Sequence, residues 1–269
     1  MNRLFCVLFL ITFCISCLNN QKQGGKGKSI STTGGKYFDQ IIFASSNCMK
    51  PCQMSNIIIN SDGSIVYKGQ GTSDKLGFYV GKLSKKTHQQ LFDKFAKIDF
   101  DTIKTEYRSL GSDQQTVSTT FLKNGRIYRT IYDYGRRAPA SLSSSYNTLE
   151  NLYKIVDLKK LSSPGFIPHF NDITTAKLKK GNMVLDITQS ETFLLSDYLR
   201  KGKITINNIH RRFILHVDYD EINPLYDVET DGRLYKFLVK GKPVTIDIGF
   251  NFYDLNKKNW QWRKATKYD

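Results

Sequence analysis

The chain has 269 residues, of which 40% are hydrophobic, and it contains 17 phenylalanines and 15 tyrosines. This composition excludes a disordered chain, which lacks the apolar side chains needed to form a core. The net charge of +16 is spread out, with +5 over residues 37–158 (16 basic, 11 acidic) and +6 over residues 159–269 (19 basic, 13 acidic). Nucleic-acid binding is disfavoured, because it concentrates Lys and Arg on one face or run.

The first seventeen residues have the features of an export signal. Arg3 precedes an apolar run over residues 4–15, which is shorter than the ~20 residues of a membrane-spanning helix, and Ser16 and Cys17 follow. The stretch resembles a bacterial lipoprotein signal, although Cys14 stands where that motif has Leu. The resemblance implies cleavage after residue 16 and lipidation of Cys17. An ordinary secretory signal is the alternative, but it would need an Ala-x-Ala-like site, which this stretch lacks.

The lipoprotein resemblance also implies a location. We expect an exported, palmitate-bearing protein of the bacterial cell envelope, attached to a membrane through Cys17, with the outer membrane favoured over the inner. Residues 17–36 are rich in Gly and Lys and have few apolar side chains, so they are expected to form a flexible tether. The expected partners are this membrane and an unidentified envelope protein or glycan, and no nucleic acid.

Short apolar runs separated by turn signals begin after the tether. Four strands are predicted over residues 41–46, 56–60, 65–70 and 77–83. Asp62-Gly63 lies between the second and third strands and predicts a hairpin. A helix capped by Ser84 follows, because Leu91, Phe95 and Ile98 form one apolar stripe.

The most clearly marked hairpin lies around Asn124-Gly125, between strands predicted over residues 116–122 and 127–132. Pro139 then suits the first turn of a helix. The apolar residues after it continue at helical spacing: Leu142, Tyr146, Leu149, Leu152 and Val156. This order of strands and helices predicts an antiparallel sheet with helices on one face.

Residues 159–170, with two prolines and a Ser-Ser-Pro-Gly run, are the predicted boundary to a second unit. Its helix is expected from a Ser190 cap through Arg200, with Gly202 as the C-terminal stop. Its strands are predicted over residues 182–188, 203–209 and 213–219, and Asp231-Gly232 opens a meander over 234–252. The predicted class is α+β, with two small domains over residues 37–158 and 166–269, each an antiparallel sheet carrying one or two helices.

One motif carries a family resemblance. The run Asn47-Cys48-Met49-Lys50-Pro51-Cys52-Gln53 separates two predicted strands, and an Asp-Gly turn and Val66-Tyr67-Lys68-Gly69 follow. This series resembles family 6438 of the domains of unknown function, found in exported bacterial proteins, over residues 37–158. The family usually has Pro and a nearby Tyr after the second cysteine, where this chain has Gln53 and Ser55. The resemblance implies a fold and a compartment, and no reaction.

Cys48 and Cys52 are four residues apart, so a tight turn can bring them within the ~7 Å that a disulfide permits between Cα atoms. Outside the cytoplasm such a pair favours a structural disulfide. Redox-active or metal-binding thiols remain the alternatives. A redox pair usually lies at a helix N-terminus, whereas this pair precedes a strand.

Other candidate sites have a simpler structural explanation. Asp227, Glu229 and Asp231 resemble the start of a calcium loop, but the twelfth position holds Leu238, so a hairpin turn is favoured. His216 and Asp218 share one strand face without a nucleophile motif. The remaining histidines lack metal-ligand spacing: His88, His169 and His210.

The sequence assigns no catalytic, cofactor-binding or metal-binding residue. Trp260 and Trp262 are compatible with sugar stacking, although closure of the second core by one of them is favoured. The favoured function is a non-catalytic binding or interaction module of the envelope. The alternative is an envelope enzyme, including a thiol-redox enzyme acting through Cys48 and Cys52. A bonded, buried pair without a cleft that gathers His, Asp or Glu would favour the module, and an exposed, reducible pair beside a cleft would favour the enzyme.

Overall fold

The computed structural model describes residues 37–49, 52–71, 73–162, 175–218, 226–267 and 269. The predicted signal peptide, Cys17 and the tether lie outside these residues, as do His169 and most of the predicted boundary. None of the helices in the described part of the chain combines the length and apolar character needed to cross a bilayer.

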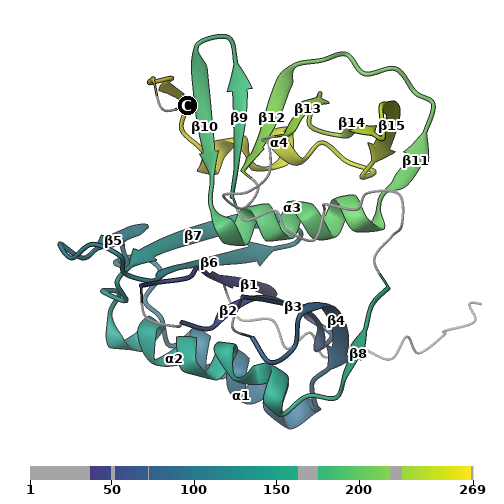
Figure 1. The fold of residues 1–269 in the computed structure, drawn as a ribbon. Helices are drawn as coiled ribbons and strands as arrows, with labels where there is room; N and C mark the ends of the chain where they lie inside the picture. The colour runs from purple at the N-terminus through teal and green to yellow at the C-terminus, as the bar shows by residue number, and fades with distance from the viewer. Residues whose placement is uncertain (1–36, 50–51, 72, 163–174, 219–225, 268) are drawn as a thin grey trace, which may run out of the picture. The chain divides into compact units, whose positions relative to one another are not determined.

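The first sheet has eight strands in the order β5-β7-β6-β1-β2-β3-β4-β8 (Figure 1). All neighbouring strands are antiparallel except β5, which runs parallel to β7. The strands are β1 (Gln40–Ser45), β2 (Met54–Ile59), β3 (Ser64–Gln70), β4 (Gly77–Lys82), β5 (Glu106–Arg108), β6 (Thr116–Lys123), β7 (Arg126–Tyr134) and β8 (Leu158–Lys160). α1 (Lys85–Ala96) and α2 (Ala140–Glu150) cover one face, and a 3-10 turn, η1 (Leu152–Lys154), follows α2.

Both predicted hairpins of this sheet are confirmed. β2 pairs antiparallel with β3, and Gly63 in their turn has a φ of +80°. β6 pairs antiparallel with β7, and Asn124 and Gly125 both have positive φ, as a type I′ turn requires. Ser84 caps α1 by accepting a hydrogen bond from the Thr87 amide.

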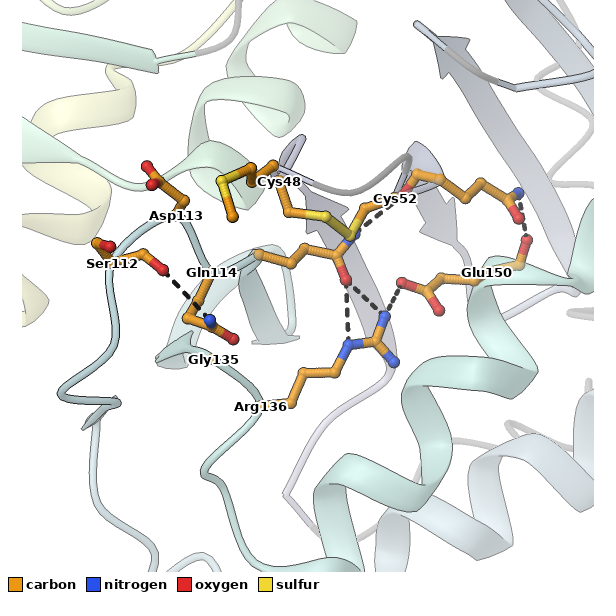
Figure 2. A pocket seen from close by; sticks show the side chains of 11 residues that line it. Cys48, Cys52, Ser112, Asp113, Gln114, Gly135, Arg136 and Glu150 are labelled. Atoms are coloured by element: carbon orange, nitrogen blue, oxygen red, sulfur yellow. Dashed lines mark hydrogen bonds and ion pairs between the residues drawn. A yellow bond between two sulfur atoms is a disulfide. The ribbon is translucent and has the colours of Figure 1, made fainter.

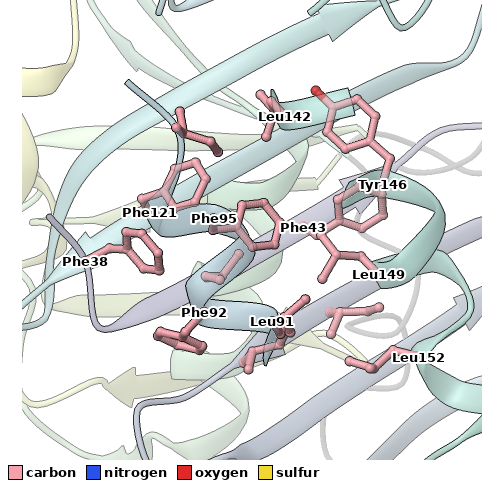
Figure 3. Packing of buried hydrophobic residues seen from close by; sticks show 14 of the residues in the cluster. Phe38, Phe43, Leu91, Phe92, Phe95, Phe121, Leu142, Tyr146, Leu149 and Leu152 are labelled. Atoms are coloured by element: carbon pink, nitrogen blue, oxygen red, sulfur yellow. The ribbon is translucent and has the colours of Figure 1, made fainter. Parts of the chain in front are cut away.

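The central strands of the first sheet are apolar on both faces. Alternate residues of a strand point to opposite sides, so Ile41 and Phe43 of β1 face the core beneath α1 and α2, whereas Ile42 faces the other side. Figure 3 shows the aromatic part of the first core, including Phe92 and Phe95. Most residues predicted from the helical stripes are buried in it: Leu91, Phe95, Ile98, Leu142, Tyr146, Leu149 and Leu152. The predicted second helix is shorter than expected, because α2 ends at Glu150, and Val156 beyond it is only partly buried.

The second sheet also has eight strands, in the order β11-β15-β14-β13-β12-β9-β10-β16. They are β9 (Thr175–Lys180), β10 (Met183–Ile187), β11 (Lys203–Thr205), β12 (Phe213–Asp218), β13 (Tyr226–Thr230), β14 (Leu234–Val239), β15 (Lys242–Asp247) and β16 (Arg263–Lys264). Its helices are α3 (Gln189–Lys201), α4 (Phe252–Asn256) and the 3-10 turn η3 (Lys257–Asn259). Every pairing in this sheet is antiparallel, so the predicted α+β class with two antiparallel-dominated sheets is confirmed.

Helix α3 packs against both sheets, because it contacts β1, β2 and β6 of the first and β9 of the second. Phe193 of α3 stacks against Phe78 of β4, with ring centroids 6.1 Å apart. The Ser190 amide donates to Ser118 Oγ at 2.8 Å, and the Ser190 hydroxyl lies 2.7 Å from Thr120 Oγ1. The face of the first sheet opposite α1 and α2 is therefore covered by the second half of the chain.

The predicted start of α3 was wrong, and its predicted end was right. Thr188, not Ser190, caps α3, because it forms a reciprocal capping box with Glu191 while Ser190 bonds to the first sheet. Gly202 is the C-cap of α3, so the predicted stop is confirmed, and its backbone is extended there, with a φ of −63°. Glycine is needed there because a Cβ would lie 2.4 Å from Ile246 Cγ2.

Other elements differ in extent. The strand predicted over residues 203–209 ends at Thr205, and the meander ends at Asp247, before α4. Pro139 stands at the N-cap of α2, one position before its first turn. The sequence did not predict five strands: β5, β8, β9, β13 and β16.

His88 is a buried histidine, and its protonation is expected to affect the free energy of unfolding. Its ring packs on Phe92, with centroids 4.3 Å apart, and its Nε2 lies 3.1 Å from the Asn60 carbonyl oxygen. Burial lowers the pKa of His88 below its ordinary value, because the charged imidazolium loses its hydration.

We predict that stability falls in acid through His88. Its folded pKa is depressed, so the unfolded chain binds the proton more tightly, and folding free energy is lost as pH falls below about 6.5. Wild-type unfolding free energy, measured by urea titration between pH 7.5 and 5.5, should decrease by up to about 1.4 kcal/mol per pH unit more than that of His88→Gln. Parallel pH profiles for the two proteins would contradict the prediction.

Candidate functional site

A pocket of about 430 Å³ lies at the end of the first sheet where β1 and β7 end and β2 and β6 begin. Three segments form it: the loop between β1 and β2, the residues before β6, and the turn between β7 and α2 together with the end of α2. The lining residues, shown in Figure 2, are Cys48, Met49, Cys52, Gln53, Ser112, Asp113, Gln114, Gln115, Gly135, Arg136 and Glu150.

One wall of the pocket contains a disulfide. Cys48 and Cys52 are bonded, with their Cα atoms 5.6 Å apart, as the spacing predicted. Both cysteines are half-buried, and the Met49 side chain between them is 80% exposed. A closed loop this short removes little entropy from the unfolded chain, about 2 kcal/mol at 25 °C, so its main effect is local.

An ion pair forms the floor. The Arg136 guanidinium is bonded through Nη2 to a carboxylate oxygen of Glu150, and its Nη1 donates to Asn147 Oδ1 at 3.0 Å. The guanidinium also lies over the Tyr146 ring, 5.9 Å from the centroid. Glu150 is 6% exposed. This burial raises the pKa of its carboxyl, and the hydrogen bond from Arg136 offsets part of that rise.

Gln115 connects the ion pair to the disulfide loop. Its Oε1 accepts hydrogen bonds from Arg136 Nε at 3.0 Å and Nη2 at 2.6 Å. Its Nε2 donates to the carbonyl oxygens of Ser46 and Gln53, at 3.0 and 3.1 Å, which flank the disulfide on either side. Gln53 Nε2 donates in turn to the Glu150 carbonyl oxygen at 2.9 Å. The loop, the amide and the ion pair thus form one closed hydrogen-bonded network.

A buried carboxylate holds the turn that carries Arg136. Asp133, which is fully buried, accepts hydrogen bonds from the Arg137 amide at 2.6 Å and the Ala138 amide at 3.0 Å. The Tyr146 hydroxyl donates to the same carboxylate at 3.0 Å. These three bonds fix the backbone immediately after Arg136 and tie it to α2.

Backbone strain is concentrated at this pocket. Four non-glycine residues in the described part of the chain have positive φ, and two of them, Asn124 and Lys240, lie in hairpin turns. The other two, Asp113 (φ 54°) and Arg136 (φ 55°), both line the pocket. This conformation costs about 1–2 kcal/mol per residue, and such strain clusters at functional sites.

A shallower hollow of about 370 Å³ adjoins the pocket and shares four of its lining residues: Cys48, Met49, Asp113 and Gln114. Tyr134 adds an aromatic ring there, and its hydroxyl accepts a hydrogen bond from the Gln114 amide at 3.2 Å. The adjoining surface therefore continues the pocket with a partly apolar wall.

The sequence motifs outside the pocket are structural. His216 Nδ1 lies 2.7 Å from Asp227 Oδ1, across the β12–β13 pair, and the Asp218 side chain is not among the described ones. Asp231 Oδ1 accepts from the amides of Arg233 and Leu234, so it stabilises the predicted turn. No group of His, Cys, Asp and Glu suited to a metal ion occurs among the described residues.

Both C-terminal tryptophans pack against the second core, as favoured from the sequence. Trp260 Nε1 donates to Glu191 Oε1 at 3.1 Å. Trp262 Nε1 donates to the Tyr253 hydroxyl at 3.0 Å, and its ring stacks against Phe213. Both indole N–H groups therefore donate hydrogen bonds to other side chains of the protein.

The family model described as "Domain of unknown function (DUF6438)" matches residues 39–153. Residues 39–153 are therefore a domain of this family, and the resemblance noted in the sequence is confirmed. No curated protein and no solved structure matches the chain. Every residue that lines the pocket lies within the matched segment, so the pocket belongs to the family domain.

The sequence motif around Cys48 and Cys52 identified the residues that form one wall of the pocket. Gln115, Arg136 and Glu150 were not predicted as site residues, because they come from three separate segments. The one sequence feature that could have indicated Arg136 is the glycine before it at the end of a strand. Gly135 permits a left-handed turn, and this turn directs the Arg136 side chain toward α2.

We predict that Arg136→Met destabilises the fold by about 2 kcal/mol, because it leaves the Glu150 carboxylate buried without its cation. The figure allows for the 34% exposure of the Arg136 side chain, which weakens the pair through solvent screening. Urea unfolding should show a smaller loss for the double variant Arg136→Met/Glu150→Gln. The exposed neighbour is the control: Arg137→Met should cost under about 0.5 kcal/mol. Equal losses for Arg136→Met and Arg137→Met would refute the role of the pair.

Proposed function

We propose that this protein is a lipid-anchored lipoprotein of the bacterial cell envelope and that it acts as a non-catalytic binding module. The pocket beside Cys48 and Cys52 is the proposed binding site. The observation that supports this proposal is the left-handed backbone at Asp113 and Arg136. Neither residue lies in a hairpin turn that would explain its positive φ, and both line the pocket.

The pocket is built as a rigid receptor. Arg136 and Glu150 neutralise each other, and Gln115 fixes the guanidinium plane through two hydrogen bonds. Groups held in this way lose little conformational entropy when a ligand binds, which favours affinity. The charged side chains on the floor therefore serve to position a surface, which supports a binding role over acid-base catalysis.

The position of the pocket also supports a tethered receptor. The described chain begins beside β1, at Tyr37, and the pocket opens after the other end of this strand, at Ser45. These ends are about 17 Å apart along the strand. A tether that joins the fold at Tyr37 would leave the pocket accessible to a partner on the side away from the attachment point.

A second candidate function is thiol-disulfide exchange through Cys48 and Cys52. It is favoured by one observation: the disulfide is half-buried, and the pocket that it lines also contains the carboxyl groups of Asp113 and Glu150. An exchange enzyme would accelerate the reduction of a peptide disulfide by dithiothreitol. A rate equal to that of the Cys48→Ser/Cys52→Ser double variant would eliminate this candidate.

We predict that Cys17→Ala releases the protein from the membrane, because the thioether-linked lipid is lost. Wild-type protein should sediment with the envelope membranes after cell lysis and incorporate labelled palmitate, whereas the variant should do neither. Cys6→Ala, which changes a cysteine in the predicted apolar run, is the matched control and should behave as wild type. A Cys17→Ala variant that remains wholly in the membrane fraction would defeat the anchoring proposal.

We predict that Asp113→Asn reduces partner binding without destabilising the fold. Asparagine tolerates the left-handed conformation, so the backbone should persist while the carboxylate at the pocket is lost. Tagged full-length protein should recover at least tenfold less of its partner from envelope extract when it carries Asp113→Asn, as measured by quantitative mass spectrometry.

The control for this binding measurement is Asp101→Asn, which removes an exposed carboxylate outside the pocket lining. It should recover the partner as wild type does. Equal recovery by wild type and Asp113→Asn would contradict the assignment of the pocket as the binding site.

A further inference from the structure

We propose that the Cys48–Cys52 disulfide is a redox-sensitive control element for the pocket, reduced by a dithiol and coupled to the Arg136–Glu150 pair. The inference rests on the proposed function of the pocket, because it concerns the regulation of that site. It follows from the way the disulfide loop is attached to the rest of the network.

The loop is held at both ends by one side chain. Gln115 Nε2 donates to the carbonyl oxygen of Ser46 before the disulfide and to that of Gln53 after it. The Met49 amide, inside the loop, donates to the Asp113 carbonyl oxygen at 3.3 Å. The two Gln115 bonds require the loop ends to stay close together. Ser45 Oγ, which donates to the Gln53 carbonyl oxygen at 3.1 Å, also holds these ends, and the covalent bond between the cysteines adds to this constraint.

The same side chains reach the floor of the pocket. Gln115 Oε1 accepts two hydrogen bonds from Arg136, and Gln53 Nε2 donates to the Glu150 carbonyl oxygen. Figure 2 shows Cys48 and Cys52 beside the ion pair of Arg136 and Glu150. When the loop ends separate, Gln115 loses its two backbone acceptors, and the guanidinium of Arg136 loses the amide that orients it.

The disulfide is accessible, and its loss leaves the rest of the fold intact. Both cysteines are half-buried, and Met49 between them is 80% exposed, so a dithiol can approach the sulfur atoms. The bridge spans four residues, and the core strands β1 and β2 on either side are paired by a hydrogen-bonded ladder that does not involve it. Reduction is therefore expected to act on the loop and the pocket alone.

The reaction is a two-electron exchange with a dithiol. One thiolate of the dithiol attacks a sulfur of the Cys48–Cys52 bond, forms a mixed disulfide and releases the other cysteine as a thiolate. The second thiol of the reagent displaces the first cysteine and leaves as an intramolecular disulfide. The reagent is oxidised, and its two protons end on the thiols of Cys48 and Cys52.

Amide hydrogen exchange on the full-length protein tests the coupling, with dithiothreitol as the reductant. Reduction should increase exchange at least tenfold in the peptides that contain residues 46–49 and 112–116 and in the turn at residues 135–138. The hairpin around Asn124 should not change. The melting temperature should fall by less than about 8 °C, and Cys48→Ser/Cys52→Ser should reproduce the reduced pattern without reductant.

The variant Gln115→Met separates coupling from loosening of the loop. In this variant reduction should still release residues 46–49 but should no longer alter exchange at residues 135–138. Gln53→Met provides a second variant, which keeps Gln115 but loses the bond to the Glu150 carbonyl oxygen and the contacts of the Gln53 side chain with Tyr67 and Tyr153. Unchanged exchange at residues 112–116 and 135–138 on reduction of the wild type would overturn the inference.

Partner recovery from envelope extract distinguishes this inference from the proposed function. Oxidised protein should recover at least tenfold more partner than reduced protein. Equal recovery by both forms would overturn the regulation and leave the binding function standing. If neither form recovers the partner but reduction changes amide hydrogen exchange as expected, the proposed binding function is refuted and the coupling between the disulfide and the ion pair is supported.

Discussion

The first sheet must be covered on both faces, and the architecture follows from this constraint. Strands β1 and β2 carry isoleucine or phenylalanine on each side, so exposing either face would leave an apolar surface in water. α1 and α2 cover one face, and α3 covers the other while also packing on the second sheet. The hydrogen bonds of Ser190 to Ser118 and Thr120 fix α3 in place. The result is a rigid sheet whose strand ends can hold loops at defined positions.

The pocket uses this rigidity. Its segments leave the ends of β1 and β7 and the starts of β2 and β6, which are neighbours in a sheet that cannot shift without exposing its core. Asp133 pins the turn after β7, and the Arg136–Glu150 pair ties that turn to α2. The disulfide adds little to the global stability of the fold, so its main effect is local. It fixes the loop that forms one wall of the pocket, and Gln115 connects this loop to the Arg136–Glu150 pair. Strain at Asp113 and Arg136 is tolerated because these surrounding contacts determine the backbone.

Local patterns in the sequence predicted much of the fold. The Asp62-Gly63 and Asn124-Gly125 hairpins, the apolar stripes of α1 and α2 and the Cys48–Cys52 bond depend on neighbouring residues, and all are confirmed. The cap of α3 was missed because Ser190 and Thr188 both suit that position, and contact with the first sheet decides between them. The short strands β5 and β8 form by pairing with the edges of the longer strands β7 and β4, and their own sequences carry no strand pattern. The Gln115–Arg136–Glu150 network joins residues up to 35 positions apart, and its members carry no local motif.

We propose that this protein binds its partner at the pocket beside the disulfide. The most direct measurement is photo-crosslinking in living cells, with a photoreactive amino acid placed at Met49, on the exposed rim of the pocket. The same amino acid at Leu238, an exposed position on β14, is the control. Binding at the pocket predicts one specific crosslinked species from Met49 that is absent from Leu238 and lost with Asp113→Asn. A species that forms from Leu238 and not from Met49 would contradict the claim.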